Sequence, residues 1–191
     1  MKWIRFSGYR FVVSALACAA LLMVVVQRGV TAEQAEAEGK ESGSALVSLL
    51  GETLVRADGE EVATKSLEGR MVALYFSALW CPPCRAFTPG LVEAYAEWKE
   101  KDLPIELVFV SFDRTKEAQA EYMTGYKMKW LAVPFEGTKR QQLGTRFSVR
   151  GIPALLVLDA EGRLVTRTGV QEVGAHGAGA LARWQAASEQ E

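Results

Sequence analysis

Apolar residues gather in short blocks along the chain from about residue 70 onward, and these blocks alternate with segments of helical periodicity. Continuous apolar runs at 71–76, 105–110 and 154–158 are typical of strands buried on both faces. Between the first two runs, an amphipathic helix is expected over 86–101. Its apolar positions are Phe87, Leu91, Val92, Tyr95 and Trp98. Strands that alternate with helices in this way predict an α/β fold with one central mixed sheet.

The segment before the first buried run predicts a small β structure. Apolar residues at 46–55 provide short strand pieces. Asp58 and Gly59 form a dipeptide typical of a hairpin turn, which leads into a further strand at 61–62. The folded domain should therefore begin near Ala45 and open with strands.

Further helices and strands are expected after the second buried run. Residues 116–124, 139–147 and 178–187 fit helices, and residues 164–166 fit the hairpin partner of the third buried strand. Residues 130–135 predict a short strand or a packed loop. That segment contains a proline, which cannot donate to a sheet ladder, so we place it at a sheet edge.

The first 32 residues differ in composition from the rest of the chain. They contain no acidic residue, and their basic residues are Lys2, Arg5, Arg10 and Arg28. Residues 11–26 are uncharged and are slightly shorter than the roughly 20 residues that span a membrane. The pattern predicts a secretory signal peptide cleaved near Ala32 or, if uncleaved, a single N-terminal membrane anchor that leaves the remaining chain outside the cytoplasm.

Residues 33–44 are rich in Ala, Glu, Gly and Ser and predict a flexible linker, so the folded domain is expected over 45–191. Four of the 22 basic side chains lie in the first 32 residues, which leaves 18 basic and 23 acidic ones, a net charge of −5. Nothing in this balance suggests binding to nucleic acid, which would need a basic patch. We expect an exported monomer that does not bind nucleic acid.

Two cysteines, Cys81 and Cys84, lie between the first buried run and the helix that follows it. Cysteines at this spacing, at a strand-to-helix junction, are typical of a thiol–disulfide redox site, because helix N–H groups favour a thiolate. A structural disulfide is a weaker alternative, since a short loop constrains the unfolded chain least. A zinc site would need Cys18 and His176 as further ligands, and Cys18 lies in the N-terminal apolar segment.

The chain resembles the thioredoxin superfamily, and within it the nucleoredoxin and tryparedoxin-like branch. The matching segments are residues 75–89, 108–113, 130–135 and 149–153. The resemblance implies a thioredoxin-like sandwich, in which a central mixed β-sheet is flanked by helices and a strand–helix insertion precedes a cis-proline, Pro153. It also implies dithiol–disulfide exchange with protein or small thiol partners.

The catalytic residues expected from this reasoning are Cys81, as the nucleophile, and Cys84, as the resolving thiol. Pro82 and Pro83 between them have no N–H, which removes two potential donors to the Cys81 thiolate. We therefore expect only moderate thiolate stabilisation and a reducing or intermediate potential. The redox-active disulfide is the only redox group expected; no other cofactor and no metal is predicted.

Substrate contacts are expected at Trp80, Pro82, Pro83, Ile152 and Pro153. Trp80 is predicted to lie beside them as a contact surface. Ile152, before Pro153, would offer its backbone to an extended substrate strand. Tyr75 stands where many thioredoxins bury an aspartate and is a candidate proton relay, and Arg85 is a candidate source of positive potential.

The leading hypothesis is an exported or membrane-tethered disulfide reductase, with a disulfide-bearing protein or small thiol as substrate. Its electrons would come from an upstream dithiol or a membrane donor, and residues 11–26 would contact the membrane if uncleaved. A disulfide oxidase or isomerase and a non-catalytic binding module with the same fold are the alternatives.

Overall fold

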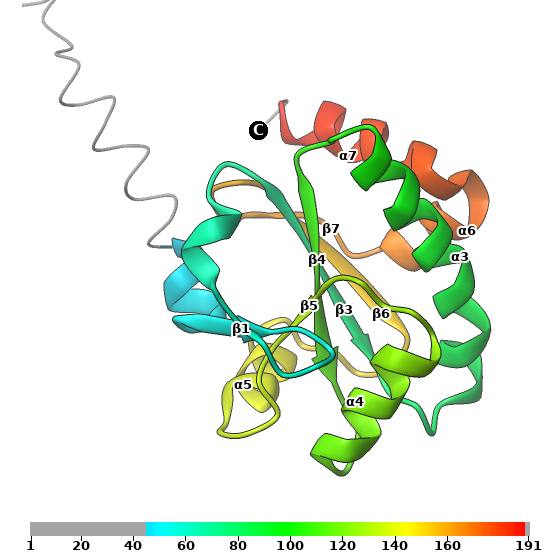
Figure 1. Ribbon diagram of the computed structural model, residues 1–191. Helices are drawn as coiled ribbons and strands as arrows, with labels where there is room; N and C mark the ends of the chain where they lie inside the picture. The colour runs from blue at the N-terminus through cyan, green and yellow to red at the C-terminus, as the bar shows by residue number, and fades with distance from the viewer. Residues whose placement is uncertain (1–44, 190–191) are drawn as a thin grey trace, which may run out of the picture. The chain divides into compact units, whose positions relative to one another are not determined.

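Seven strands form one mixed sheet in the computed structural model, which describes residues 45–189 (Figure 1). The strands are β1 (Thr53–Val55), β2 (Glu61–Ala63), β3 (Met71–Ser77), β4 (Ile105–Ser111), β5 (Leu131–Ala132), β6 (Ala154–Leu158) and β7 (Leu164–Thr166). The α-helices are α3 (Pro82–Glu100), α4 (Lys116–Gly125), α5 (Lys139–Arg146), α6 (Gly169–His176) and α7 (Ala180–Ser188). Short 3-10 helices are η2 (Thr64–Leu67) and η3 (Gly177–Gly179), and residues 45–50 are also helical.

The order across the sheet is β2-β1-β5-β4-β3-β6-β7, so β3 and β4 lie near its centre. They pair in parallel, from Met71 opposite Ile105 to Ser77 opposite Ser111, while β6 pairs antiparallel with β3. Because β3 and β4 end at the same edge of the sheet, the loops that follow them meet there. The fold class expected from the sequence is confirmed.

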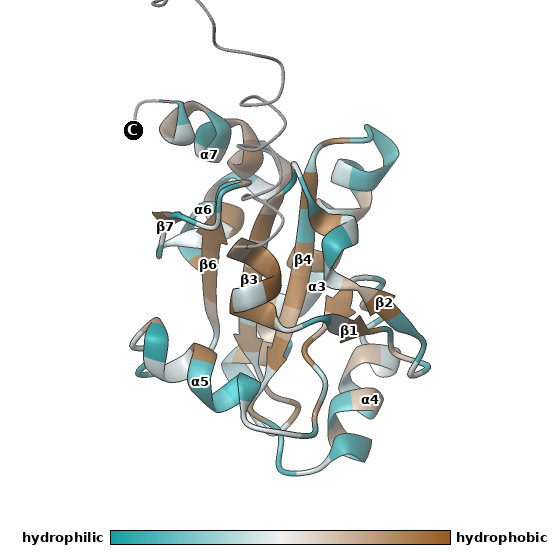
Figure 2. Ribbon diagram, turned by 90° about the vertical axis from the view of Figure 1, so that its left-hand side faces the viewer, coloured by the Kyte–Doolittle hydropathy of each residue, from teal (hydrophilic) through white to brown (hydrophobic). Residues whose placement is uncertain are grey.

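Apolar layers cover both faces of the central strands. Successive side chains of a strand point to opposite faces, so Tyr75 packs with α3, α4, α6 and α7, whereas Leu74 and Phe76 pack with α5 and residues 45–50. Every residue of β3 and β4 is buried, which explains their unbroken apolar runs. In Figure 2 the central strands β3, β4 and β6 are drawn largely in the brown of hydrophobic residues.

The expectation that the domain opens with strands is wrong for residues 45–50, which are helical. Leu46, Leu49 and Leu50 follow helical spacing, and all three are buried. The segment that follows does form the expected hairpin, because β1 and β2 pair antiparallel with Leu54 opposite Val62.

The placement of the segment with Pro134 at a sheet edge is also wrong. β5 lies between β1 and β4, with Ala132 opposite Val55 and Leu131 opposite Val108. Pro134 lies beyond the two residues of β5, and the Val133 N–H still donates to the Phe109 carbonyl at 2.9 Å. The missing proline N–H therefore falls outside the sheet ladder.

The last part of the chain contains one helix more than its sequence pattern predicts. Residues 169–176, between the strand expected at 164–166 and the helix expected at 178–187, form α6, and the final helix begins at Ala180. Glycines disfavour a helix in isolation, but Val173 is buried against the sheet, so packing outweighs intrinsic propensity here.

Residues 1–32, expected to be a signal peptide or anchor, and the linker at 33–44 lie outside the described residues. Within residues 45–189, no helix combines the length and apolar character needed to cross a membrane.

Candidate functional site

Cys81 and Cys84 lie at the start of α3, just beyond the end of β3. Cys81 is the N-cap residue and is joined to Cys84 by a disulfide, with their Cα atoms 5.2 Å apart. The Cys84 N–H donates to Cys81 Sγ at 3.3 Å, so the sulfur stands where a capping oxygen usually does. After reduction, the partial positive charge of the helix N-terminus favours a thiolate at this position.

Pro82 and Pro83 fill the first two positions of α3, which therefore begins four residues earlier than expected. Both are exposed, and neither carries an N–H. Of the first helical turn, the Cys84 N–H is the backbone donor that reaches the Cys81 sulfur. This geometry supports moderate rather than strong thiolate stabilisation.

The Ile152–Pro153 peptide bond is cis, as the resemblance implies. The Ile152 carbonyl oxygen lies 3.7 Å from Cys81 Sγ. Ile152 and Phe112 also pack against the small cluster that contains Cys81 and Cys84. The structure thus brings two loops that are far apart in the sequence to the same disulfide.

Trp80 is the one large apolar side chain that is exposed among residues 45–189, with 55% of its surface accessible. Its indole N–H donates to the Phe112 carbonyl at 3.1 Å, which fixes the ring at the end of β4. A hollow of about 600 Å³ begins at Trp80 and extends past Asp113 to Ser148 and Arg150. An exposed, oriented aromatic ring beside the disulfide is suited to contact a partner.

Asp113 supports this loop, a role that the sequence pattern does not reveal. Its carboxylate accepts the Leu79 N–H and the Ser111 hydroxyl, both at 2.8 Å. Asp113 and Thr115 are the two residues whose place in the sequence suits a cap for the helix at 116–124, and the cap is Thr115, which accepts the Ala118 N–H. Burial raises the pKa of Asp113, although these hydrogen bonds and the nearby Arg140 oppose the rise.

Substitution of Asp113 by Asn is expected to change the pH dependence of stability. A carboxyl whose pKa is raised by folding stabilises the fold fully below its unfolded pKa of about 4, and this contribution is lost as pH rises through the folded pKa. The free energy of unfolding of the wild type should therefore fall, relative to Asp113→Asn, as pH rises from about 3 to 7. Urea denaturation across that range measures the difference, and Asp58→Asn controls for the change in net charge.

Tyr75 takes part in a buried network of hydroxyl groups beneath Cys84. It bonds to the Thr88 hydroxyl at 2.8 Å and accepts from Ser77 at 2.9 Å, and Tyr122 joins the same network. On the side of the cysteines, the Tyr75 hydroxyl donates to the Cys84 carbonyl oxygen at 3.4 Å. Burial raises the pKa of Tyr75, so its phenol stays protonated. A proton could therefore pass along this network only by exchange between hydroxyl groups, without formation of a phenolate. Its relay role stays a prediction.

Arg85 is exposed on the first turn of α3, and its contribution to the potential at the sulfurs also stays a prediction. His176 is exposed at the end of α6. Within the described part of the chain, no three His, Cys, Asp or Glu side chains are grouped so as to hold a metal ion. The zinc alternative therefore gains no support from these residues.

The fold and the site define a redox protein of the thioredoxin type, with a Cys-Pro-Pro-Cys motif that faces a cis-proline. Comparison with known proteins agrees, since the thioredoxin-like family matches residues 69–164. A probable nucleoredoxin 1 of Arabidopsis thaliana is 43% identical over 148 residues, which is 78% of this chain. The chain spans only 25% of the length of that relative.

Solved structures extend the comparison. Native tryparedoxin I from Crithidia fasciculata is 42% identical, with a TM-score of 0.64 over 71% of this chain and 94% of its own. A tryparedoxin II complexed with glutathionylspermidine is 34% identical, with a TM-score of 0.61 over 67% of this chain and 88% of its own. The chain belongs to the thioredoxin-like family, in the branch of the nucleoredoxins and tryparedoxins. Proteins of this branch are thiol–disulfide oxidoreductases.

Proposed function

We propose that this protein reduces disulfides in proteins or small molecules through Cys81 and Cys84. The observation that carries the proposal is the placement of Cys81 at the N-cap of α3, with the Cys84 N–H on its sulfur and the Ile152 carbonyl 3.7 Å away. This arrangement stabilises a thiolate next to a backbone edge that can hold a substrate.

The reaction transfers two electrons from the Cys81–Cys84 dithiol to the substrate. The Cys81 thiolate attacks one sulfur of the substrate disulfide, which forms a mixed disulfide and releases the other sulfur as a thiolate that takes up a proton. Cys84 then loses its proton and attacks Cys81 Sγ. The second substrate sulfur leaves as a thiol, and the Cys81–Cys84 disulfide remains.

Substrate contacts are proposed at the residues that surround the sulfur. An extended segment would pair with the backbone at Ile152, while Trp80, Pro82 and Pro83 present exposed surface beside it. The tryparedoxin II structure holds glutathionylspermidine, a small thiol. A compound of that chemical class, as substrate or as electron donor, is therefore a reasonable first candidate beside protein disulfides.

The reduction potential of the cysteine pair tests the direction of the reaction. We expect about −270 mV, near that of thioredoxin, because two of the first donors of α3 are absent. Equilibration of the protein with dithiothreitol at varied thiol and disulfide ratios, followed by mass spectrometry of the alkylated protein, measures it. A value near about −120 mV would establish a disulfide donor instead, and failure to exchange would leave only a binding module.

We also propose that the protein is exported, as a monomer that is either soluble or held by one N-terminal helix. The support comes from the sequence alone, in the basic start, the uncharged residues 11–26 and the small residues at 30–32. An external reductase needs electrons from across the membrane, so a membrane dithiol donor would be its partner. The intact mass of the protein recovered from cells tests cleavage near Ala32, and its fractionation tests the location.

A further inference from the structure

A second hollow, of about 700 Å³, lies at the other end of the central strands and is not part of the redox site. Its floor includes Glu106 at the start of β4, whereas Asp113 beside the redox site follows the end of the same strand. Glu106 and Ser111, which lines the hollow beside the redox site, are five residues apart in β4, and at about 3.3 Å per residue this separates the two regions by roughly 16 Å. A volume of this size falls in the range of small-molecule sites.

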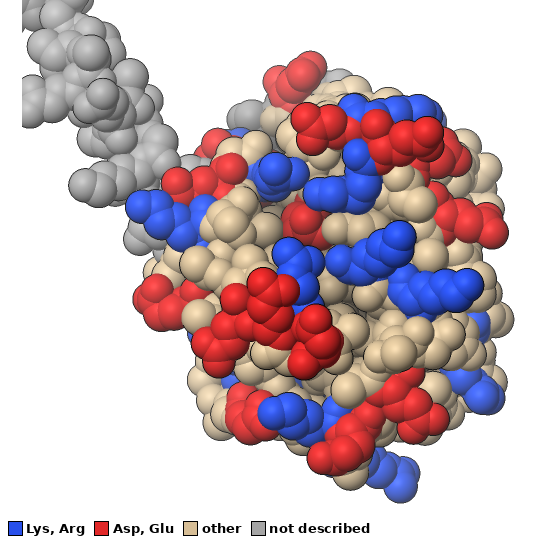
Figure 3. All heavy atoms as spheres, in the orientation of Figure 1, with Lys and Arg blue, Asp and Glu red and all other residues tan. Residues whose placement is uncertain are grey.

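Basic side chains from four separate segments surround this hollow. They are Arg56 after β1, Arg70 before β3, Lys99 on α3, and Lys127 and Lys129 between α4 and β5. Figure 3 shows basic side chains gathered around a depression on the face that Figure 1 presents. Among residues 45–189, Glu106 is the only acidic residue that lines the hollow.

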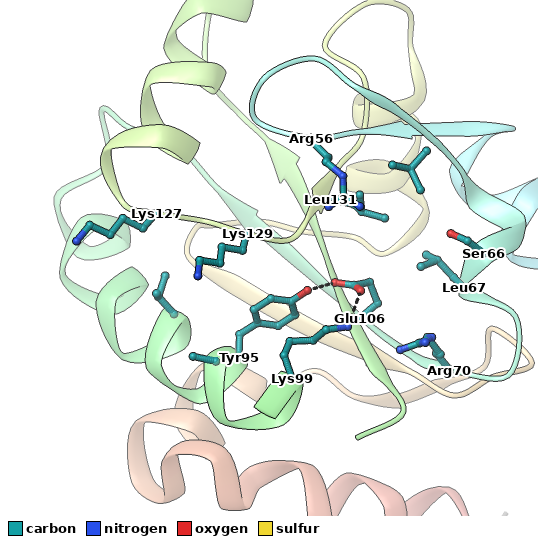
Figure 4. A pocket seen from close by; sticks show the side chains of 13 residues that line it. Arg56, Ser66, Leu67, Arg70, Tyr95, Lys99, Glu106, Lys127, Lys129 and Leu131 are labelled. Carbon is teal, nitrogen blue, oxygen red and sulfur yellow. Dashed lines mark hydrogen bonds and ion pairs between the residues drawn. The ribbon is translucent and has the colours of Figure 1, made fainter. Parts of the chain in front are cut away.

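The negative charge of Glu106 is already engaged. Its carboxylate accepts the Tyr95 hydroxyl at 2.5 Å and the Leu107 N–H at 3.1 Å, and it pairs with Lys99 at 3.5 Å (Figure 4). Burial and the adjacent Glu106 carboxylate raise the pKa of Tyr95, so the phenol remains the donor. Glu106 is therefore held in place by Tyr95, the Leu107 N–H and Lys99, and among residues 45–189 Lys99 is the one lining cation that it pairs with.

Three of the basic side chains have no acidic partner within residues 45–189. Arg56 pairs with Glu60 at 3.0 Å, but Arg70, Lys127 and Lys129 form no ion pair there. Arg70 and Lys129 lie on opposite sides of the Tyr95–Glu106 pair, and Lys127 extends outward from the rim (Figure 4). Like charges held around one hollow repel each other, and a multivalent anion would relieve that repulsion.

The walls of the hollow are apolar, so the part of a ligand that contacts them should be apolar as well. They include Val62, Leu67, Val92 and Leu131. A guanidinium group binds phosphate oxygens through paired hydrogen bonds, and linked phosphates place several negative charges within a few ångströms of each other. We propose that this hollow binds a phosphate-bearing small molecule, with its phosphates on Arg70, Lys129 and their basic neighbours and an apolar ring or chain against the walls.

Titration calorimetry with ATP as the probe tests this proposal on the full-length protein. We expect saturable binding that weakens at least tenfold in the double variant Arg70→Gln, Lys129→Gln. The matched control is Lys101→Gln, Arg183→Gln, which removes two exposed charges that do not line the hollow. Adenosine should not bind, because it lacks the phosphates that the basic side chains would hold. Tripolyphosphate should bind more weakly than ATP, because it lacks the ring that would pack against the apolar walls.

A lipid headgroup carries the same phosphate chemistry as a free ligand. Vesicles that contain phosphatidylinositol 4,5-bisphosphate distinguish the two sources, since a headgroup site would bind the vesicles and not ATP, and would lose binding in the same double variant. The proposal is overturned if neither probe binds, or if the lining variant and the control lose affinity equally. Far-UV circular dichroism and thermal melting of both variants show whether each is folded. Cys81→Ser should bind the probe normally, which separates this site from the redox function.

Discussion

Cys81→Ser is expected to reduce the rate of disulfide exchange by about 10³-fold or more, because a serine hydroxyl is not ionised at neutral pH and cannot replace the attacking thiolate. The initial rate of insulin disulfide reduction, with dithiothreitol as electron source and its background rate subtracted, measures the loss. Cys84→Ser should behave differently. It retains the nucleophile but cannot resolve the mixed disulfide, so a covalent Cys81 adduct with the substrate should accumulate and be visible by mass spectrometry.

The asymmetry between the two variants is what the geometry requires. Both cysteines are buried, Cys81 with 3% of its surface accessible and Cys84 with none, but Cys81 is the cap residue that receives the Cys84 N–H and lies against the Ile152 carbonyl. Cys18→Ser, at a cysteine outside the described residues, is the matched control and should leave the rate unchanged. Accumulation of the adduct on Cys84 in the Cys81→Ser variant would reverse the assigned roles.

The strands at the centre of the sheet could be predicted from the sequence because burial on both faces leaves an unbroken apolar run. β3, β4 and β6 each match such a run within one residue. The surrounding elements are harder to predict. Leu46, Leu49 and Leu50 fit both a strand and one face of a helix, and only their packing under the sheet decides between them. α6 depends on contacts with β6 that its glycine-containing sequence does not suggest.

The residues of the candidate site also differ in how well the sequence predicts them. Cys81, Cys84 and Pro153 could be found from the sequence because a short motif and a family resemblance mark them. The role of Asp113 could not be found in this way, since an aspartate before a helix indicates a helix cap. Its hydrogen bond with the Leu79 N–H joins residues that are 34 positions apart in the sequence. The basic hollow is equally invisible in the sequence, because its cations come from four segments and the net charge of the chain is −1.

Gly169→Ala is expected to destabilise the fold by about 1–3 kcal/mol, the usual range for a group forced into a packed interior. A Cβ atom at this position would lie 2.7 Å from the Leu155 carbonyl oxygen and 2.9 Å from its Cγ atom. Leu155 is fully buried in β6, so neither its backbone nor its side chain can move without disturbing the sheet. Urea denaturation at constant pH measures the change as a shift in midpoint.

Gly174→Ala, in the same helix, should have the opposite effect. No atom lies within 4 Å of a Cβ built there, so alanine adds helix propensity without a clash and should stabilise the protein by up to about 1 kcal/mol.

Leu155 also follows Pro153 by two residues, so a displacement of β6 in Gly169→Ala should reach the backbone that faces Cys81 and slow disulfide exchange. Equal free energies of unfolding for the two variants would show that Gly169 in α6 does not pack closely against Leu155 in β6. A loss of stability with an unchanged exchange rate would show that the cis-proline loop keeps its position independently of the strand it precedes.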